Sequence, residues 1–184
     1  MNLGPCPRIP FLTLGAVNRM ERADFMRALG GVFEHSPWVT EATWPMRPFG
    51  DVAALHRAMV AAVRSAPAEQ QLELIRAHPD LAGKAARSGE MTAHSVSEQG
   101  SAGLLSLTDV EYEHFHRLNA AYRERFHFPF IIAVRRHNKT SLLAAFEARL
   151  GNARETEIEN ALAEIFTITR LRLDTQFGAA SWVN

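Results

Sequence analysis

Residues 52–64 read VAALHRAMVAAVR and follow Asp51, and this stretch decides the fold class. Its apolar residues Leu55, Met59 and Val63 recur every four positions, which places them on one face of an α-helix. Asp51 is a residue type that caps helices well, because its carboxylate accepts backbone N–H groups of the first turn. The stretch therefore predicts an amphipathic helix that buries one stripe against a core.

Helical patterns dominate the rest of the chain as well. We expect helices from Asn18, as the N-cap, to Leu29, from Pro67 to His78, from Ser95 onward, from Thr108 to Arg125, and over residues 141–150 and 155–177. No hairpin dipeptide separates runs of alternating apolar and polar residues. The sequence therefore predicts an all-α fold: a single-domain helical bundle of about seven to nine helices over residues 1–184, with a loosely structured segment at residues 1–11.

Three stretches depart from the helical pattern. Residues 36–50 carry three prolines and end in a glycine, so we expect a connection with little regular structure. Residues 83–92 are polar and contain glycine, which is typical of a surface loop. Residues 126–134 read FHFPFIIAV, and because Pro129 has no backbone N–H to donate, we expect a buried extended segment rather than a sheet strand.

The composition of the chain limits which partners and which cellular compartment we expect for the protein. The 184 residues include 20 Lys and Arg and 20 Asp and Glu, so the formal net charge is zero, which argues against a nucleic-acid partner or an anionic membrane. A single cysteine, Cys6, cannot form an internal disulfide, as expected in a reducing compartment. No apolar run approaches the roughly 20 residues of a membrane span, and the N-terminus lacks the pattern of a signal peptide. We therefore expect a cytoplasmic protein with no membrane partner.

The eight histidines do not suggest a metal site. His114 and His116 are two positions apart on a predicted helix, about 200° around its axis, so they cannot share one metal ion. No His-Glu-x-x-His or Cys-x-x-Cys pattern occurs. Gly100 and Gly103 lack the preceding strand and the lysine of a phosphate-binding loop. We expect neither a metal nor another cofactor.

His78 and Pro79 carry the strongest chemical signal in the chain. Histidine has an unperturbed pKa of about 6.5, so it can give and take a proton near neutral pH. Pro79 fixes the backbone beside it and ends the helix. His78 is therefore either a proton-transfer group or a helix C-terminal histidine favoured by the helix dipole, and these residues alone leave both interpretations open.

The other candidate residues also have two interpretations each. Ser95 and Glu98, with Gln99 beside them, belong to a site or form a capping box, in which serine starts a helix and glutamate follows three residues later. Residues 128–132 line a pocket or are plain core. Arg172 lies between leucines, where it binds an anion, is paired within the protein, or extends to solvent.

Together these segments closely resemble one family. The motifs are HPDLAG at residues 78–83, the Ser95-x-x-Glu98-Gln99 cluster with residues 102–104, and FHFPFIIAVR at residues 126–135, with further matches at residues 34–38, 47–49 and 171–173. They occur in the order typical of 2-oxo-4-hydroxy-4-carboxy-5-ureidoimidazoline (OHCU) decarboxylases, and the resemblance spans residues 14–178. These enzymes catalyse the last step from urate to allantoin. The resemblance implies an all-α, cofactor-free lyase that acts on OHCU and forms a homodimer.

The resemblance also implies roles for individual residues. His78 would be the general acid/base, and Glu98 a second catalytic residue that keeps His78 in its useful protonation state. The remaining residues would contact the substrate: Pro79, Ser95, Gln99 and Arg172, with backbone groups of Phe130, Ile131 and Ile132. Because the electrons left by CO₂ loss can be held as an enolate, no metal or pyridoxal is required. Proton delivery to one face would then give (S)-allantoin.

Two positions depart from the family's usual glycine, namely His127 and Arg136. Glycine adopts a positive φ cheaply whereas histidine does so at a cost, so we expect either a slightly different backbone at His127 or its side chain at the site rim.

Two other functions remain open from the residues. One is a non-catalytic helical interaction module that presents residues 128–134 to a partner, and the other is a lyase or hydrolase acting on a different ureido heterocycle. A closed pocket that gathers the polar candidates would favour an enzyme, and an exposed apolar patch would favour the module.

Overall fold

The computed structural model describes residues 11–82 and 91–178. Its α-helices are α1 (Leu14–Arg19), α2 (Arg22–Leu29), α3 (Pro37–Thr43), α4 (Val52–Ser65), α5 (Ala68–Arg76), α7 (Ala93–Ser101), α8 (Asp109–Phe126), α9 (Lys139–Arg149) and α10 (Arg154–Gln176), with short 3-10 helices η1 (Trp44–Met46) and η2 (Val134–Arg136). These nine α-helices, without a strand among the described residues, confirm the all-α prediction. Residues 1–10 of the loose segment expected at 1–11, and most of the loop expected at 83–92, lie outside the described residues.

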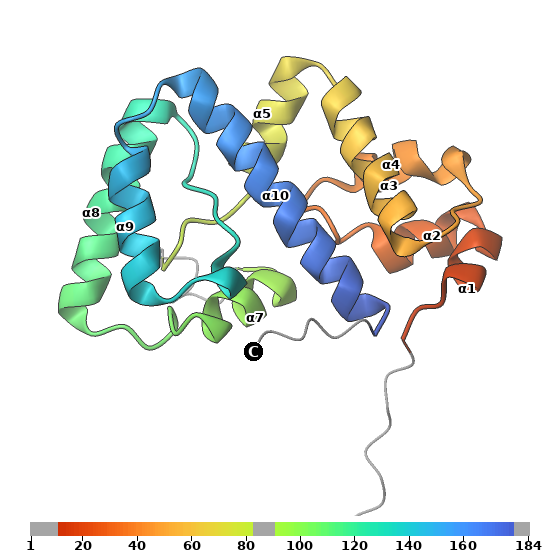
Figure 1. Ribbon diagram of the computed structural model, residues 1–184, viewed down its shortest axis with the longest axis horizontal. Coiled ribbons are helices and arrows are strands. Elements are labelled where there is room, and N and C mark those ends of the chain that lie inside the picture. The colour runs from red at the N-terminus through yellow and green to blue at the C-terminus, as the bar shows by residue number, and fades with distance from the viewer. Residues whose placement is uncertain (1–10, 83–90, 179–184) are drawn as a thin grey trace, which may run out of the picture.

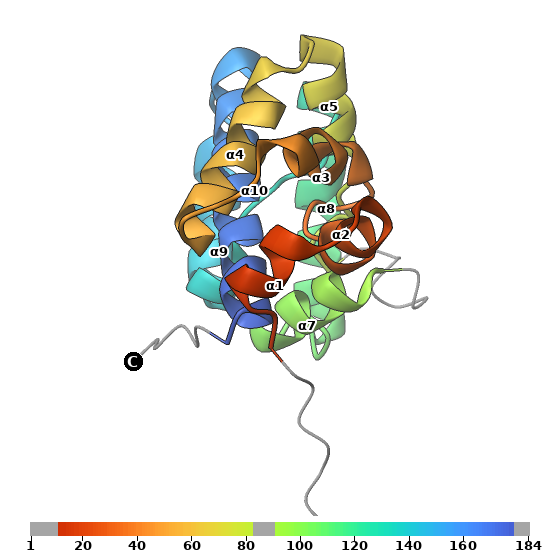
Figure 2. The same ribbon diagram turned by 90° about the vertical axis from the view of Figure 1, so that its right-hand side faces the viewer.

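The long helix α10 is the centre of the architecture. It crosses the molecule diagonally, with α8 and α9 on one side and α1 to α5 on the other (Figure 1). Its buried residues include Leu162, Ile165 and Leu173, which lie on one broad face of the helix at 100° per residue. Both views place α7 near the end of the molecule where α10 finishes (Figure 1 and Figure 2).

Aromatic packing holds the extended segment that follows α8. The ring of Phe130 stacks on that of Phe146 in α9 with centroids 3.9 Å apart, and Tyr122 of α8 meets the Phe130 ring edge-on at 5.2 Å. Phe128 and Phe126 join the same cluster and are buried. The predicted buried extended segment is confirmed, and its backbone passes between α8, α9 and α10.

Helix caps agree with the sequence at two helices. Asp51 accepts from the backbone N–H of Ala54 at 2.5 Å and starts α4, and Thr108 forms a capping box with Glu111 at the start of α8.

Other helix boundaries differ from the prediction. Asn18 does not cap a helix: it lies within α1, and its side-chain amide exchanges two 2.9 Å hydrogen bonds with the backbone of Phe49. Residues 36–50 are more regular than expected, since they form α3 and η1. Pro37 occupies the first turn of α3, where its missing N–H costs nothing. No helix in the described residues is long and apolar enough to cross a membrane.

Candidate active site

His78 lies just beyond the end of α5, two residues after the last helical residue, Arg76. Its ring Nδ1 is 2.9 Å from the backbone carbonyl of Leu74. Because a carbonyl only accepts hydrogen bonds, Nδ1 carries the proton and Nε2 holds the lone pair in the neutral ring. Nε2 is buried and has no partner in the described structure. The local fold therefore leaves one imidazole nitrogen of His78 without a protein partner.

The turn after His78 is clamped from two helices. Gln99 of α7 accepts from the backbone N–H of Ala82 at 2.9 Å and donates to the carbonyl of Asp80 at 3.2 Å. Asn119 of α8 donates to the carbonyl of Leu81 at 2.8 Å. Ala82 has a φ of 51°, a left-handed conformation that costs energy for a residue with a Cβ. These side chains hold the turn in a shape that the local sequence alone does not favour.

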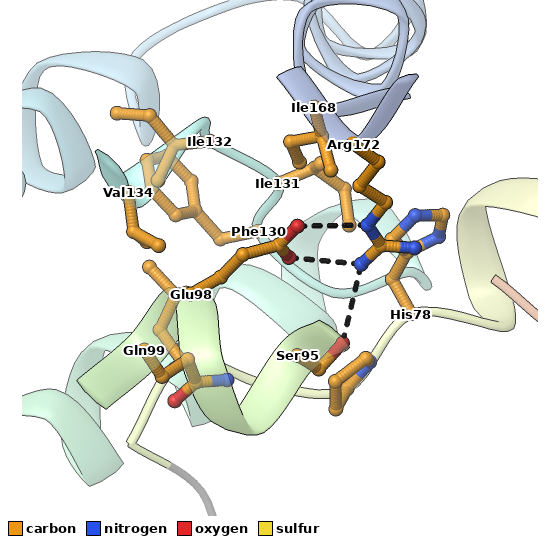
Figure 3. A pocket seen from close by; sticks show the side chains of 12 residues that line it. His78, Ser95, Glu98, Gln99, Phe130, Ile131, Ile132, Val134, Ile168 and Arg172 are labelled. Atoms are coloured by element: carbon orange, nitrogen blue, oxygen red, sulfur yellow. Dashed lines mark hydrogen bonds and ion pairs between the residues drawn. The ribbon is translucent and has the colours of Figure 1, made fainter. Parts of the chain in front are cut away.

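Helix α7 supplies the polar cluster. Its N-cap is Thr92, whose hydroxyl accepts from the backbone N–H of Ser95 at 3.3 Å. The alternative that Ser95 and Glu98 form a capping box is therefore wrong, because both residues lie inside the helix. Their spacing of three places them on one face, with Gln99 beside them. That face points toward the end of α10 (Figure 3).

Arg172 of α10 contacts several of the polar residues of the site and is only 2% exposed. Its Nε and Nη2 donate to the two carboxylate oxygens of Glu98 at 2.7 and 2.8 Å, and Nη2 is 3.5 Å from the hydroxyl of Ser95 (Figure 3). Its Nη1 donates to the carbonyl of Val32 at 3.2 Å. The guanidinium is thus paired within the protein, and Ser95 is its longest contact.

Glu34 is a second carboxylate on Arg172, and the sequence analysis did not identify it as a site residue. It lies between α2 and α3, and its Oε2 is 2.9 Å from Nη1 of Arg172, a charge contact without good hydrogen-bond alignment. Its Oε1 accepts from the hydroxyl of Thr92 at 2.6 Å. Although burial alone would raise the pKa of Glu34, the hydrogen bond from Thr92 and the charge of Arg172 hold that pKa below its usual value. Glu34 is therefore ionised at neutral pH.

Burial also sets the charge of His78, lowering its pKa to about 4. The charge of Glu34 opposes this shift, while those of Arg172 and His35 add to it. His78 is therefore neutral at physiological pH and competent as a base. The carboxylate that favours its protonated form is that of Glu34, whereas the sequence analysis gave this effect to Glu98.

The extended segment after α8 forms the apolar wall. The carbonyl of Ile131 accepts from Nη1 of Arg149 at 2.8 Å, and the backbone N–H of Ala133 donates to Glu164 at 2.8 Å. Arg149 is itself held by the buried carboxylate of Glu157 at 2.9 Å. The wall is thus fixed by polar side chains of α9 and α10 on its outer side.

These elements line a pocket that opens to solvent. It contains all nine residues that the sequence analysis proposed for the site (Figure 3). Its lining is His78, Pro79, Leu81, Ser95, Glu98, Gln99, Phe130, Ile131, Ile132, Val134, Ile168 and Arg172. Such a pocket, with apolar walls and a few convergent polar groups, is typical of a small-molecule site. Within residues 11–82 and 91–178, no three His, Cys, Asp or Glu side chains gather as metal ligands.

Comparison with known proteins settles the family. A family model described as OHCU decarboxylase matches residues 18–174. The chain belongs to the OHCU decarboxylase family. It is 47% identical over 168 residues to the 2-oxo-4-hydroxy-4-carboxy-5-ureidoimidazoline decarboxylase of Haloferax volcanii, covering 91% of this chain and 98% of the relative. The mouse protein of the same name is 37% identical over 90% of this chain and 93% of its own length.

A solved structure supports the same assignment. The crystal structure of an (S)-allantoin synthase matches with a TM-score of 0.70 and 33% sequence identity, over 90% of this chain and 54% of that chain.

The family's usual glycine at position 127 has a visible reason. His127 ends α8 in the left-handed conformation, with φ 64° and ψ 27°, so the backbone keeps a geometry that favours glycine. Its side chain is exposed and does not line the pocket, so the alternative that it enters the site rim is wrong. Arg136 has no positive φ, and the backbone there does not require glycine.

Proposed function

We propose that this chain decarboxylates OHCU to (S)-allantoin, the last step of urate degradation, without a cofactor and with His78 as general base and acid. The observation that carries the proposal is the buried, unpartnered Nε2 of His78 in a pocket that also contains Glu98, Ser95 and Arg172. The names of the relatives support the reaction, and the similarity to an (S)-allantoin synthase supports the product.

The substrate's name defines the electron flow. OHCU carries its hydroxyl and carboxylate together on C4, an oxo group on C2 and the ureido group on C5, so the remaining ring double bond joins C5 to nitrogen. When the C4–carboxylate bond breaks, its electron pair forms a C4=C5 double bond. The C5=N pair moves to the ring nitrogen, which takes up a proton from solvent, so the electrons are held at this nitrogen and not as the enolate expected from the sequence. The resulting enol becomes allantoin when its oxygen loses a proton and C5 gains one.

His78 is suited to both proton transfers of the enol. Its neutral Nε2 accepts the proton from the C4 hydroxyl, and the imidazolium then delivers a proton to C5. Because the ring is fixed by the Leu74 carbonyl and the clamped turn, delivery occurs to one face of C5. A single face gives a single enantiomer.

The neighbouring side chains orient the substrate. Ser95 contacts Arg172 only at 3.5 Å, so its hydroxyl is the polar group most readily turned to the ureido or ring atoms. Glu98 accepts from substrate N–H groups while Arg172 holds its position. We assign Gln99 to the pocket wall and to the turn after His78, since its amide already bonds the backbone there. The apolar wall around Ile131 excludes water, which strengthens each of these contacts.

The interaction-module alternative receives less support, because residues 130–132 are buried and face the polar groups instead of forming an exposed patch. Action on a different ureido heterocycle is the remaining competitor. The homodimer and the cytoplasmic location stay predictions.

The product's handedness tests the proposal. Freshly generated OHCU decays spontaneously to racemic allantoin, which has no circular dichroism. With the protein present, we expect a growing signal of (S)-allantoin in proportion to protein concentration. Racemic product at the spontaneous rate would refute the function, and turnover of another ureido heterocycle in its place would select the competitor.

A further inference from the structure

Glu34 is a buried charge that the proposed mechanism has not yet used. It is 2% exposed and lies behind the pocket lining, where it contacts Arg172 on one side and Thr92 on the other. A buried carboxylate is costly unless its charge is compensated, and Glu34 shares its only described cation, Arg172, with Glu98.

The charges around Arg172 do not balance. Glu98 binds the guanidinium through two hydrogen bonds, and Glu34 approaches the remaining nitrogen, so two carboxylates share one cation. With His78 neutral, this cluster carries one excess negative charge. Protonation of His78 would cancel that excess, and the proposed reaction requires such a protonated state.

We propose that Glu34 is a positioning residue of the reaction: its charge stabilises His78 while the imidazole holds the proton taken from the substrate. This inference rests on the proposed function. Glu34 acts through space and does not touch the substrate. Its contacts with Arg172 and Thr92 fix the carboxylate, so that its charge is in place before the proton moves.

Among the residues that the structure describes, the other charged groups around His78 do not supply this stabilisation. Arg172 and His35 both disfavour the protonated ring. Glu98 is held by Arg172, and His94 on α7 interacts with Arg172, Glu98 and Glu34. Glu34 is buried and lies 2.9 Å from the guanidinium of Arg172, which lines the same pocket as His78. From this position its negative charge opposes the effect of burial on the pKa of His78.

A purely structural role for Glu34 is the competing explanation. Thr92 caps α7 and also donates to Glu34, so the carboxylate ties the start of α7 to the segment between α2 and α3. Loss of the hydrogen bond between Thr92 and residue 34 would destabilise the start of α7, whether or not residue 34 is charged. The test must therefore separate the charge of the side chain from its shape.

Two substitutions make that separation. Glu34→Gln keeps the shape and loses the charge, whereas Glu34→Asp keeps the charge and shortens the side chain. A charge role predicts that Gln lowers kcat by about tenfold or more, the equivalent of one pKa unit, with KM little changed, and that Asp retains more activity than Gln. If Glu34 only ties α7 to the segment between α2 and α3, the Gln variant should retain more activity than the Asp variant. Glu41→Gln, an exposed glutamate on α3 paired with Arg22, is the matched control and should behave as the wild type.

A second readout does not depend on activity. The imidazole ¹³C resonances of His78, followed by NMR as acid is added, should show protonation in the wild type near pH 4 and at distinctly lower pH in Glu34→Gln. Superimposable titrations would overturn the role of Glu34, even with an active enzyme. A shifted titration in a chain that does not decarboxylate OHCU would sustain the electrostatic link and refute the proposed function.

Discussion

In the proposed reaction, the contact between His78 and the Leu74 carbonyl decides which ring nitrogen meets the substrate. It leaves Nε2 as the base, and burial keeps that base unprotonated far below the usual range of histidine. Between about pH 4 and pH 6.5, His78 is therefore neutral in the folded protein and protonated in the unfolded chain, where its pKa is about 6.5. By linkage, His78 favours unfolding as pH falls from about 6.5 toward 4, and contributes nothing to pH dependence above that window.

The same shift predicts a pH profile. We expect kcat/KM, which reports the free enzyme, to be flat between pH 6 and 8 as far as His78 is concerned, and to fall only as pH approaches about 4. Initial rates across this range, with spontaneous decay subtracted, measure it. An acidic limb centred near 6.5 would mean that His78 titrates like an exposed histidine.

His127 allows a prediction about stability. Its left-handed conformation costs a residue with a Cβ about 1 kcal/mol, which glycine avoids. His127→Gly should therefore raise the free energy of unfolding by about 1 kcal/mol, as measured by urea denaturation. His127→Ala removes the imidazole but keeps the Cβ, so it should bring no such gain. Equal gains in both variants would show that the side chain, and not φ, is the source of strain.

The nine residues predicted for the site line one pocket, and each of them belongs to a recognisable sequence motif. Their roles in catalysis and binding stay predictions. Glu34 was missed as a site residue although residues 34–38 supported the family resemblance, since only its tertiary neighbours show what the carboxylate contacts. Asn119 lies in an ordinary helix, and its hydrogen bond to Leu81 spans 38 positions, so no local pattern could reveal it.

At the scale of elements, caps explain which boundaries could be predicted. Asp51 and Thr108 bond their own first turns, so the signal and the contact are both local. Asn18 has the same residue type as a cap, but its amide bonds Phe49, 31 positions away. Ser95 and Glu98 have the spacing of a capping box, yet Thr92 starts the helix three residues earlier. Tertiary partners decide these cases, and the local sequence does not record them.

The start of α10 supports the pocket wall through a buried ion pair. Glu157 is fully buried and accepts from Tyr122, Arg149, Asn152 and Asn160, while Arg149 holds the carbonyl of Ile131. Glu157→Gln leaves the Arg149 charge without its buried partner, so we expect about 3 kcal/mol loss of stability in chemical denaturation. Glu155→Gln, on an exposed position of the same turn, should change stability by less than about 0.5 kcal/mol. A loss no larger than the control's would mean that the wall does not depend on this network.

At the scale of the whole molecule, the site joins segments that are distant in the chain. Arg172 contacts Glu34, Glu98 and the carbonyl of Val32, which is 140 positions away. Helix propensity and periodicity predicted the helices that carry these residues, whereas their convergence depends on how α10 packs between the two groups of helices (Figure 1). The family resemblance supplied the grouping that local physics could not.

The proposed reaction depends on the unpartnered Nε2 of His78, which moves the proton that makes it fast and stereospecific. The direct measurement is the rate of (S)-allantoin formation by His78→Ala, followed by circular dichroism, with His116→Ala at an exposed position of α8 as control. We predict a loss of at least about 100-fold in kcat for His78→Ala with a wild-type far-ultraviolet spectrum, and no loss for the control. A folded His78→Ala protein that forms (S)-allantoin at the wild-type rate would show that His78 is not the group that transfers the proton.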